Sequence, residues 1–262
     1  MRRDRFHYVY GPVSSWRLGS SLGIDPISSR KKVCSFDCIY CQLGRTKAVS
    51  DTRRIFVSAE DIISELNALP PLSVDYITFS GAGEPTLADN VGQMMRIIKK
   101  VRKEKIAVIT NASLMDREDV QNDLLSADYI IAKLDASSQE VFEVINRPPA
   151  TITFETVVKA LKDFKKIYTG KIALQIMMIE ENKAFAQDIA AVARSIGPHE
   201  IQLNTPLRPC AIAPLRPEEM RKIKAYFGGM SVVSVYESKK KKVTPISGDD
   251  TLKRRGKTLN HV

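Results

Sequence analysis

The chain has 262 residues, of which 44% are hydrophobic and 27% are charged, with 13 glycines and 13 prolines. This composition excludes a disordered or fibrous protein, and the length allows one large α/β domain or two modest ones. No apolar stretch approaches the length of a bilayer span, and no apolar segment follows the N-terminal arginines, so we expect a cytoplasmic protein without a membrane partner.

The formal net charge of +10 suggests a polyanionic partner such as a nucleic acid. The densest basic stretches are residues 239–242 and 252–257, and no aromatic residues are interleaved with them. A platform for stacking bases is therefore not visible. A flexible C-terminal tail is the alternative interpretation of these stretches.

Short apolar runs alternate with segments of helical period, which predicts βα units and a mostly parallel sheet. The predicted strands cover residues 21–27, 74–80, 105–110, 128–135, 171–179 and 200–205. Ser58 and Thr153 are typical N-caps for helices over 59–69 and 154–164. Further helices are predicted near 89–103, 116–126, 138–146, 182–196 and 217–227.

These elements divide the chain into a core over residues 1–227, which includes an N-terminal extension, and a C-terminal appendage with a basic tail over 228–262. Periodicity alone does not separate an open doubly wound sheet from a partial barrel. In both folds, functional residues lie at the carboxyl ends of the strands. Polar residues are found at these ends: Ser80, Glu84, Thr110, Asn111, Lys133, Asp135, Asn204 and Thr205.

Three of the four cysteines, Cys34, Cys38 and Cys41, form a C-x3-C-x2-C pattern that follows the first predicted strand. Three thiolates this close can bind one soft metal centre and leave one metal position free for a small molecule. A structural zinc site would need a fourth ligand, and neither His7 nor Cys210 has a helpful spacing. We interpret Cys210 as an incidental thiol, and we do not expect a disulfide framework.

The segment CSFDCIYC, with Tyr40 before the last cysteine, resembles the cysteine loop of the radical S-adenosylmethionine (SAM) enzymes, and FSGAGEPTL at 79–87 resembles their Gly-Gly-Glu-Pro element. The resemblance implies an α/β fold, a (βα)6 partial TIM-type barrel over residues 20 to 210. It also implies that the three cysteines hold a [4Fe–4S] cluster and that SAM chelates the fourth iron. An external one-electron reductant of flavodoxin or ferredoxin type would drive cleavage of SAM to methionine and a 5′-deoxyadenosyl radical.

The resemblance assigns the contact with the methionyl end of SAM to Gly81, Ala82, Gly83 and Glu84. Glycines at 81 and 83 allow a sharp turn and a close approach of the backbone to a ligand. Ala82 stands where the family has its first glycine, and a methyl group is tolerated there if φ is negative. Taken alone, the same residues fit an ordinary strand-to-helix turn.

Asn111 and Ser113 in TNASL and Asp135 in AKLDA resemble the positions from which family members reach the ribose and the methionine carboxylate. A helix cap or a satisfied buried polar group is an equal alternative for each. Three further polar residues are candidates for lining the same cavity: Gln175, Asn204 and Arg208.

A wider similarity, which includes GPVSSWRLG and NTPLRP, relates the chain to a small prokaryotic radical SAM group near the synthases of the wyosine base in tRNA. The substrate stays open between a tRNA base and a small metabolite or protein side chain. A zinc-binding interaction module is the remaining alternative. Trp16 and Arg17 could close the lower rim of the barrel or contact the substrate.

Overall fold

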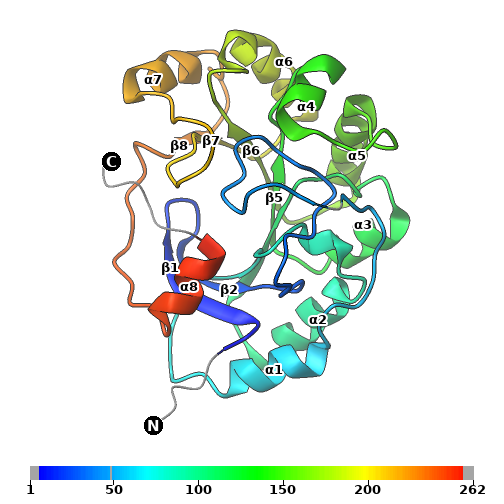
Figure 1. The fold of residues 1–262 in the computed structure, drawn as a ribbon, viewed down its shortest axis with the longest axis vertical. Helices are drawn as coiled ribbons and strands as arrows, with labels where there is room; N and C mark the ends of the chain where they lie inside the picture. The colour runs from blue at the N-terminus through cyan, green and yellow to red at the C-terminus, as the bar shows by residue number, and fades with distance from the viewer. Residues whose placement is uncertain (1–5, 48, 256–262) are drawn as a thin grey trace.

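The computed structural model describes residues 6–47 and 49–255, which form one curled sheet with helices on its outer side (Figure 1). Eight strands are hydrogen-bonded in chain order, from β1 to β8. They are β1 (Val9–Ser15), β2 (Gly19–Ile24), β3 (Tyr76–Phe79), β4 (Lys105–Thr110), β5 (Tyr129–Lys133), β6 (Lys171–Met177), β7 (Glu200–Asn204) and β8 (Val232–Ser234). The predicted partial barrel is confirmed.

The six predicted strands are β2 to β7, and they pair with one another in parallel. Two strands were not predicted. β1 pairs antiparallel with β2, and Gly11 and Pro12 interrupt its sequence pattern. β8 is only three residues long and pairs in parallel with β7. The division of the chain at residue 227 stays a prediction, although β8 belongs to the same sheet as the core.

The predicted helices are present as α1 (Ala59–Asn67), α2 (Val91–Val101), α3 (Glu118–Leu124), α4 (Gln139–Asn146), α5 (Phe154–Ile167), α6 (Ala186–Ile196) and α7 (Pro217–Ala225). Ser58 caps α1 by accepting a hydrogen bond from the backbone N–H of Asp61 at 3.0 Å. Thr153 caps α5 in the same way, with Thr156 N–H at 3.1 Å. Both N-caps predicted from the sequence are therefore confirmed.

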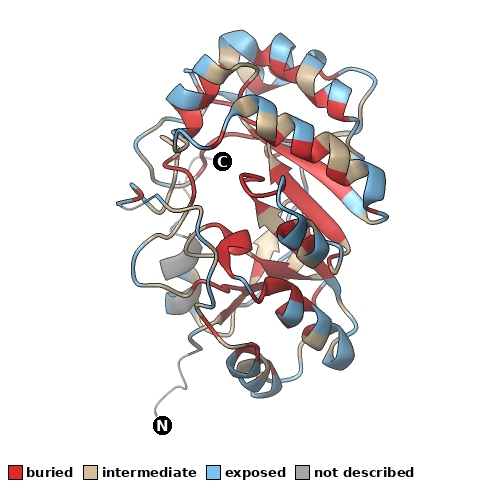
Figure 2. Ribbon diagram, turned by 90° about the vertical axis from the view of Figure 1, so that its right-hand side faces the viewer, coloured by how far each residue is buried: buried red, intermediate tan, exposed pale blue. Residues whose placement is uncertain are grey.

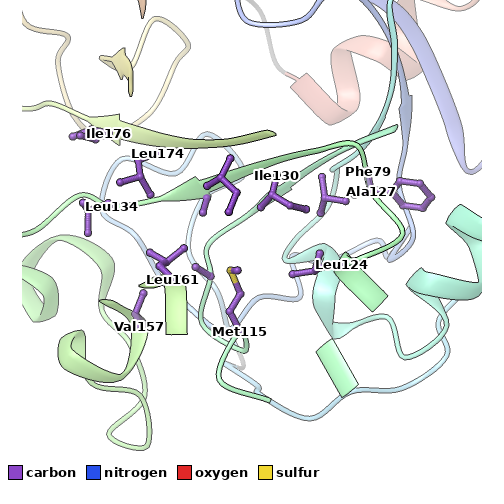
Figure 3. Close-up of a cluster of buried hydrophobic side chains, with 14 of the residues drawn as sticks. Phe79, Met115, Leu124, Ala127, Ile130, Leu134, Val157, Leu161, Leu174 and Ile176 are labelled. Carbon is purple, nitrogen blue, oxygen red and sulfur yellow. The ribbon is translucent and has the colours of Figure 1, made fainter. Parts of the chain in front are cut away.

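The main core lies between the outer face of the sheet and these helices, where buried residues of both meet (Figure 2). Figure 3 shows Ile130 of β5 and Leu174 of β6 above Leu161 of α5 and Met115. All four side chains are buried. Because alternate residues of a strand point to opposite faces, the same strands present a second set of side chains inside the curl.

A smaller apolar cluster fills part of this inner face. Leu18, at the tip of the β1–β2 hairpin, packs against Ala107, Tyr129, Ile131 and Ala173. These four residues alternate with the outward-facing core residues of β4, β5 and β6. Of the two roles predicted for the N-terminal extension, the position of Leu18 supports closure of the barrel interior.

The segment after β8 runs to a further helix, α8 (Gly248–Arg255), beside β1 (Figure 1). Ile246 N–H donates to the Gly11 carbonyl at 2.6 Å, and Gly11 N–H donates to Thr251 Oγ1 at 3.2 Å. Lys241 pairs with Asp75 at 2.6 Å. Up to residue 255, this part of the chain is a packed segment and not the free tail of the alternative interpretation. No helix of the described ranges is long and apolar enough to cross a bilayer.

Candidate functional site

The cysteine loop is joined to the turn after β3 by backbone hydrogen bonds. Val33 N–H donates to the Ala82 carbonyl, and Glu84 N–H donates to the Val33 carbonyl, both at 3.1 Å. A Cβ atom at Gly83 would lie 1.6 Å from the Val33 oxygen. Only glycine permits this approach, so the two segments that the sequence pairs by resemblance also meet in space.

A second junction joins the loop to the C-terminal end of α4. The backbone N–H groups of Asp37 and Ile39 donate to the carbonyls of Asn146 and Ile145 at 3.1 and 3.0 Å. These carbonyls belong to the last turn of a helix, where no intrahelical donor remains. Arg147 then adopts a left-handed conformation with φ of 47°, which ends the helix. The loop is thereby fixed by its backbone before Cys34 and on both sides of Cys38.

Two of the three thiols accept hydrogen bonds from asparagine side chains. Asn111 Nδ2 lies 3.6 Å from Cys34 Sγ, and Asn146 Nδ2 lies 3.5 Å from Cys38 Sγ. Burial and the charge of Glu84 raise the pKa of the Cys34 thiol to about 12. Burial and the charge of Asp135 also raise the pKa of Cys38. Without a metal to replace the proton, both thiols are therefore neutral at physiological pH.

The four cysteines are free thiols. Over residues 6–47 and 49–255, no three His, Cys, Asp or Glu side chains stand close enough together to hold one metal ion. Thiolates that bind a cubane cluster sit on separate iron corners, so they lie farther apart than the ligands of a single ion.

The predicted SAM-binding turn is built against Asp25, which directly follows β2. Gly81 has φ of 150°, and a Cβ atom there would lie 2.2 Å from Asp25 Cγ. Ala82 N–H donates to Asp25 Oδ2 at 3.1 Å. Ala82 is not among the described residues with positive φ, so its methyl group causes no backbone strain.

Glu84 is 2% exposed, and both of its carboxylate oxygens accept hydrogen bonds from the protein. Oε1 accepts from Thr86 N–H at 3.1 Å, Thr86 Oγ1 at 2.7 Å and Thr110 Oγ1 at 2.6 Å, and Oε2 accepts from Asn111 N–H at 2.7 Å. Burial raises the pKa of Glu84, while these donors oppose the shift. The carboxylate joins the turn after β3 to the end of β4, so it is engaged within the protein.

We expect Glu84→Gln to lower the free energy of unfolding by about 2 to 3 kcal/mol, because two of the donors are backbone N–H groups that cannot reverse. A glutamine NH2 would face one of them and leave it unsatisfied. Thermal unfolding of the variant measures the effect. Glu60→Gln, on the exposed side of α1, removes the same charge and serves as the control. Equal midpoints of thermal unfolding for the two variants would show that the hydrogen bonds of the Glu84 carboxylate do not stabilise the turn.

Asn111 and Ser113, predicted at this site, face the cysteine loop. Asn111 Nδ2 donates to Ser35 Oγ at 2.9 Å, and Ser35 Oγ lies 2.6 Å from Ser113 Oγ. Between them, the buried Ala112 has φ of 64°, a conformation that non-glycine residues rarely adopt. This turn directs both neighbouring side chains toward the cysteine loop.

Asp135 is the centre of a buried network that reaches the same loop from β5. Oδ2 accepts from Tyr40 Oη and from Asn146 Nδ2, the latter at 2.9 Å. Oδ1 accepts from Met177 N–H at 2.7 Å and pairs with Lys133 at 3.3 Å. Burial and the charge of Asp135 raise the pKa of Tyr40, which therefore stays a hydrogen-bond donor. The tyrosine between the second and third cysteines thus attaches the loop to the barrel.

A cavity of about 750 Å³ lies beside the cysteine loop, between the end of α4 and the segment after β7. It is lined by Asp37, Cys38, Ile39, Cys41, Gln42, Gly44, Arg45, Val144, Arg147, Glu181, Pro209, Cys210, Ala211 and Ile212. Cys210 therefore shares a cavity with two of the loop cysteines, which its place in the sequence did not indicate.

The three further polar candidates lie elsewhere around the loop. Gln175 accepts from Lys133 at 3.0 Å, and no described residue is a partner of its buried Nε2. Arg208 donates to Gln42 at 2.8 Å and so connects the loop to the segment after β7. Asn204 is buried at the end of β7. None of the three lines the cavity beside the cysteine loop, and their predicted place along the barrel interior stays a prediction.

Comparison with known proteins identifies the family. A sequence model described as the Radical SAM superfamily matches residues 30–193, which include the cysteine loop and the turn at Gly83. The chain belongs to the radical SAM superfamily. It is also 42% identical over 205 residues to a UPF0026 protein of Synechocystis, covering 78% of this chain and 77% of the relative.

Solved radical SAM structures share the fold. A radical SAM methyltransferase from Sphaerobacter thermophilus has a TM-score of 0.62 at 15% identity, covering 82% of this chain and 66% of the neighbour. Archaeal TYW1 has a TM-score of 0.56 at 15% identity, covering 80% and 72%. Membership of the superfamily makes the chain a radical SAM enzyme, whose cofactors are a [4Fe–4S] cluster and SAM.

The residues of this radical SAM protein fit such cofactors. Three free thiols lie on one loop whose backbone is fixed before Cys34 and on both sides of Cys38, and two asparagine amides donate to two of the sulfurs. Sequence reasoning missed three participants: Asp25, Ser35 and Asn146. Only Asn146 could have been found from the sequence. It is a polar residue beside the apolar positions of α4, and it directly precedes Arg147-Pro148, where the helix ends.

Proposed function

We propose that this radical SAM enzyme binds its cluster through Cys34, Cys38 and Cys41 and presents SAM to it from the turn at Gly81–Glu84. When bound, the two cofactors together supply reductive cleavage of the sulfonium to methionine and a 5′-deoxyadenosyl radical, which abstracts hydrogen from a substrate. The observation that carries the proposal is the hydrogen-bonded junction between Val33 and Gly83.

The roles of the chain's own residues follow from their contacts. The backbone polar groups of Gly81 and Gly83 are proposed to meet the methionyl end of SAM, because Glu84 and both backbone polar groups of Ala82 are engaged internally. Asn111 and Asn146 donate to thiolate sulfurs, and such hydrogen bonds stabilise negative charge on a metal ligand. Asn111, Ser113 and Asp135 are proposed to orient the loop as well as the nucleoside.

Anaerobic reconstitution tests this function directly. We expect protein with about four irons and four sulfides per chain to convert SAM to 5′-deoxyadenosine and methionine when dithionite supplies the electron. Liquid chromatography with mass detection measures both products. Protein without iron is the control. A fully loaded protein that yields no 5′-deoxyadenosine under dithionite would contradict the proposal.

The substrate is proposed to lie on the inner face of the half-barrel, where Lys133 and Gln175 form a polar pair on neighbouring strands. The buried Nε2 of Gln175 is a hydrogen-bond donor without a partner in the described structure, and such a group favours a ligand with an acceptor oxygen. A small metabolite, a protein side chain and a tRNA base all offer one. The tRNA partner therefore stays a prediction that rests on the net charge of +10.

A further inference from the structure

Asn146 contacts the cysteine loop through both its backbone and its side chain. Its carbonyl accepts the Asp37 N–H at 3.1 Å, and its Nδ2 lies 3.5 Å from Cys38 Sγ. The residue is 2% exposed, so little water reaches these contacts. Because the backbone bond does not depend on the side chain, the amide can be replaced while the loop stays attached to α4.

The acceptors around this amide fix its orientation. Nδ2 donates to Asp135 Oδ2 at 2.9 Å and to Cys38 Sγ, and an inverted amide would turn its oxygen toward both of these acceptors. Tyr40 Oη, 3.4 Å from Nδ2, donates its own proton to Asp135. In the observed orientation no described residue is a partner of the buried Oδ1. A buried acceptor without a partner costs free energy, so stability of the fold does not explain an asparagine at this position.

The second asparagine beside a thiol, Asn111, is held differently. Its Nδ2 lies 3.6 Å from Cys34 Sγ but also donates to Ser35 Oγ at 2.9 Å, and its Oδ1 accepts the Ser113 N–H at 2.9 Å. The protein thus engages both ends of the Asn111 amide. Asn146 has only its nitrogen engaged within the described residues, so its side chain acts there as a donor alone.

We infer that Asn146 is a positioning residue that raises the reduction potential of the cluster through its hydrogen bond to Cys38. The inference rests on the proposed function, in which Cys38 is a ligand of the cluster. Hydrogen bonds to the sulfurs are among the factors that set the potentials of iron–sulfur clusters, because they stabilise the added negative charge of the reduced state. The low dielectric constant of a buried site strengthens this effect.

The neighbouring carboxylate makes the loss of this amide more costly for the reduced state. Asn146 Nδ2 bridges the Asp135 carboxylate and the Cys38 sulfur, which both carry negative charge once a metal has replaced the thiol proton. Without the amide, the charge of Asp135 would act on the sulfur with no donor between them. Removal of the side-chain donor should therefore lower the potential.

The test measures the midpoint potential of the reconstituted cluster by spectroelectrochemistry in the absence of SAM. One electron enters from the electrode, and no atom is transferred. For Asn146→Ala we expect reduction to become about tenfold less favourable, which corresponds to a fall of about 59 mV for a one-electron couple. Asn146→Asp keeps the shape of the side chain and removes the same donor, so its potential should fall as well.

Asn90→Ala is the matched control. Asn90 is also buried, and its Oδ1 also has no partner among the described residues, but its Nδ2 donates to the Val57 carbonyl at 2.9 Å and not to a cysteine. The potential of this variant should equal that of the parent. Unchanged potentials in both Asn146 variants, or an equal fall in Asn90→Ala, would overturn the inference. Loss of iron from both Asn146 variants would also overturn it, because the amide would then serve assembly of the site and not its potential.

Failure of the proposed function would give a different result. The potential is read without SAM, so a loaded parent protein that accepts the electron but yields no 5′-deoxyadenosine would count against the function alone. Parent protein that takes up no iron would overturn the function and this inference together.

Discussion

Replacing Cys34, Cys38 or Cys41 by alanine is expected to abolish cluster binding and SAM cleavage, because each thiolate would hold a different iron. Iron and sulfide should fall from about four per chain to near background. The fold should survive, since the loop is held by backbone hydrogen bonds to the turn after β3 and to α4 and not by the thiols. Metal analysis after anaerobic reconstitution, together with circular dichroism, measures both effects.

Cys210→Ala is the matched control for these variants. Its thiol lies in the same cavity as Cys38 and Cys41 but donates to the Ile212 carbonyl at 3.2 Å. We expect this variant to retain its iron and its activity. Equal loss of iron from all four single variants would contradict the three-thiol site and support a four-ligand site.

Gly83→Ala is expected to destabilise the protein by about 3 kcal/mol or more and to deplete the cluster. The new Cβ would lie 1.6 Å from the Val33 oxygen, which is backbone and cannot rotate away. Val33 must move, and Cys34 moves with it. Thermal unfolding and iron content of the variant measure the two consequences together.

Gly228→Ala provides the comparison for Gly83. A Cβ there would meet only the Ala225 carbonyl, at 3.4 Å, and the residue has no positive φ. We expect its midpoint of unfolding to match the parent. A Gly83→Ala protein that unfolds at the parent temperature with full iron would refute the junction between the turn and the loop.

The parallel core was predictable because its elements show regular periods. β4 has the bounds that the apolar run at 105–110 predicted, and Ser58 and Thr153 cap their helices as expected. β1 was not predictable, because its strand pattern is broken at Gly11-Pro12. α8 was not predicted, because its residues are mostly polar and basic and therefore show no apolar stripe of helical period.

The site was predictable only where neighbouring residues carry the signal. The cysteine spacing and the glycine turn are local, and the structure brings them together through Val33 and Gly83. Asp25 and Asn146 act on residues far away in the chain: Asp25 on Ala82, and Asn146 on Cys38 and Asp135. No local pattern records such partners. For Glu84 the local pattern was misleading: its position in the sequence suggested contact with a ligand, whereas its carboxylate is bonded to the protein itself.

The segment that covers β1 has a consequence for self-association. An outermost strand normally offers unpaired peptide groups to any other extended chain, a common route to aggregation. Here the backbone N–H and C=O of Gly11 are already bonded to Thr251 and Ile246, and the next residue, Pro12, has no N–H to offer. The last part of the sequence thus shields the first strand, so loss of the C-terminal residues would expose a surface on which two copies could pair edge to edge.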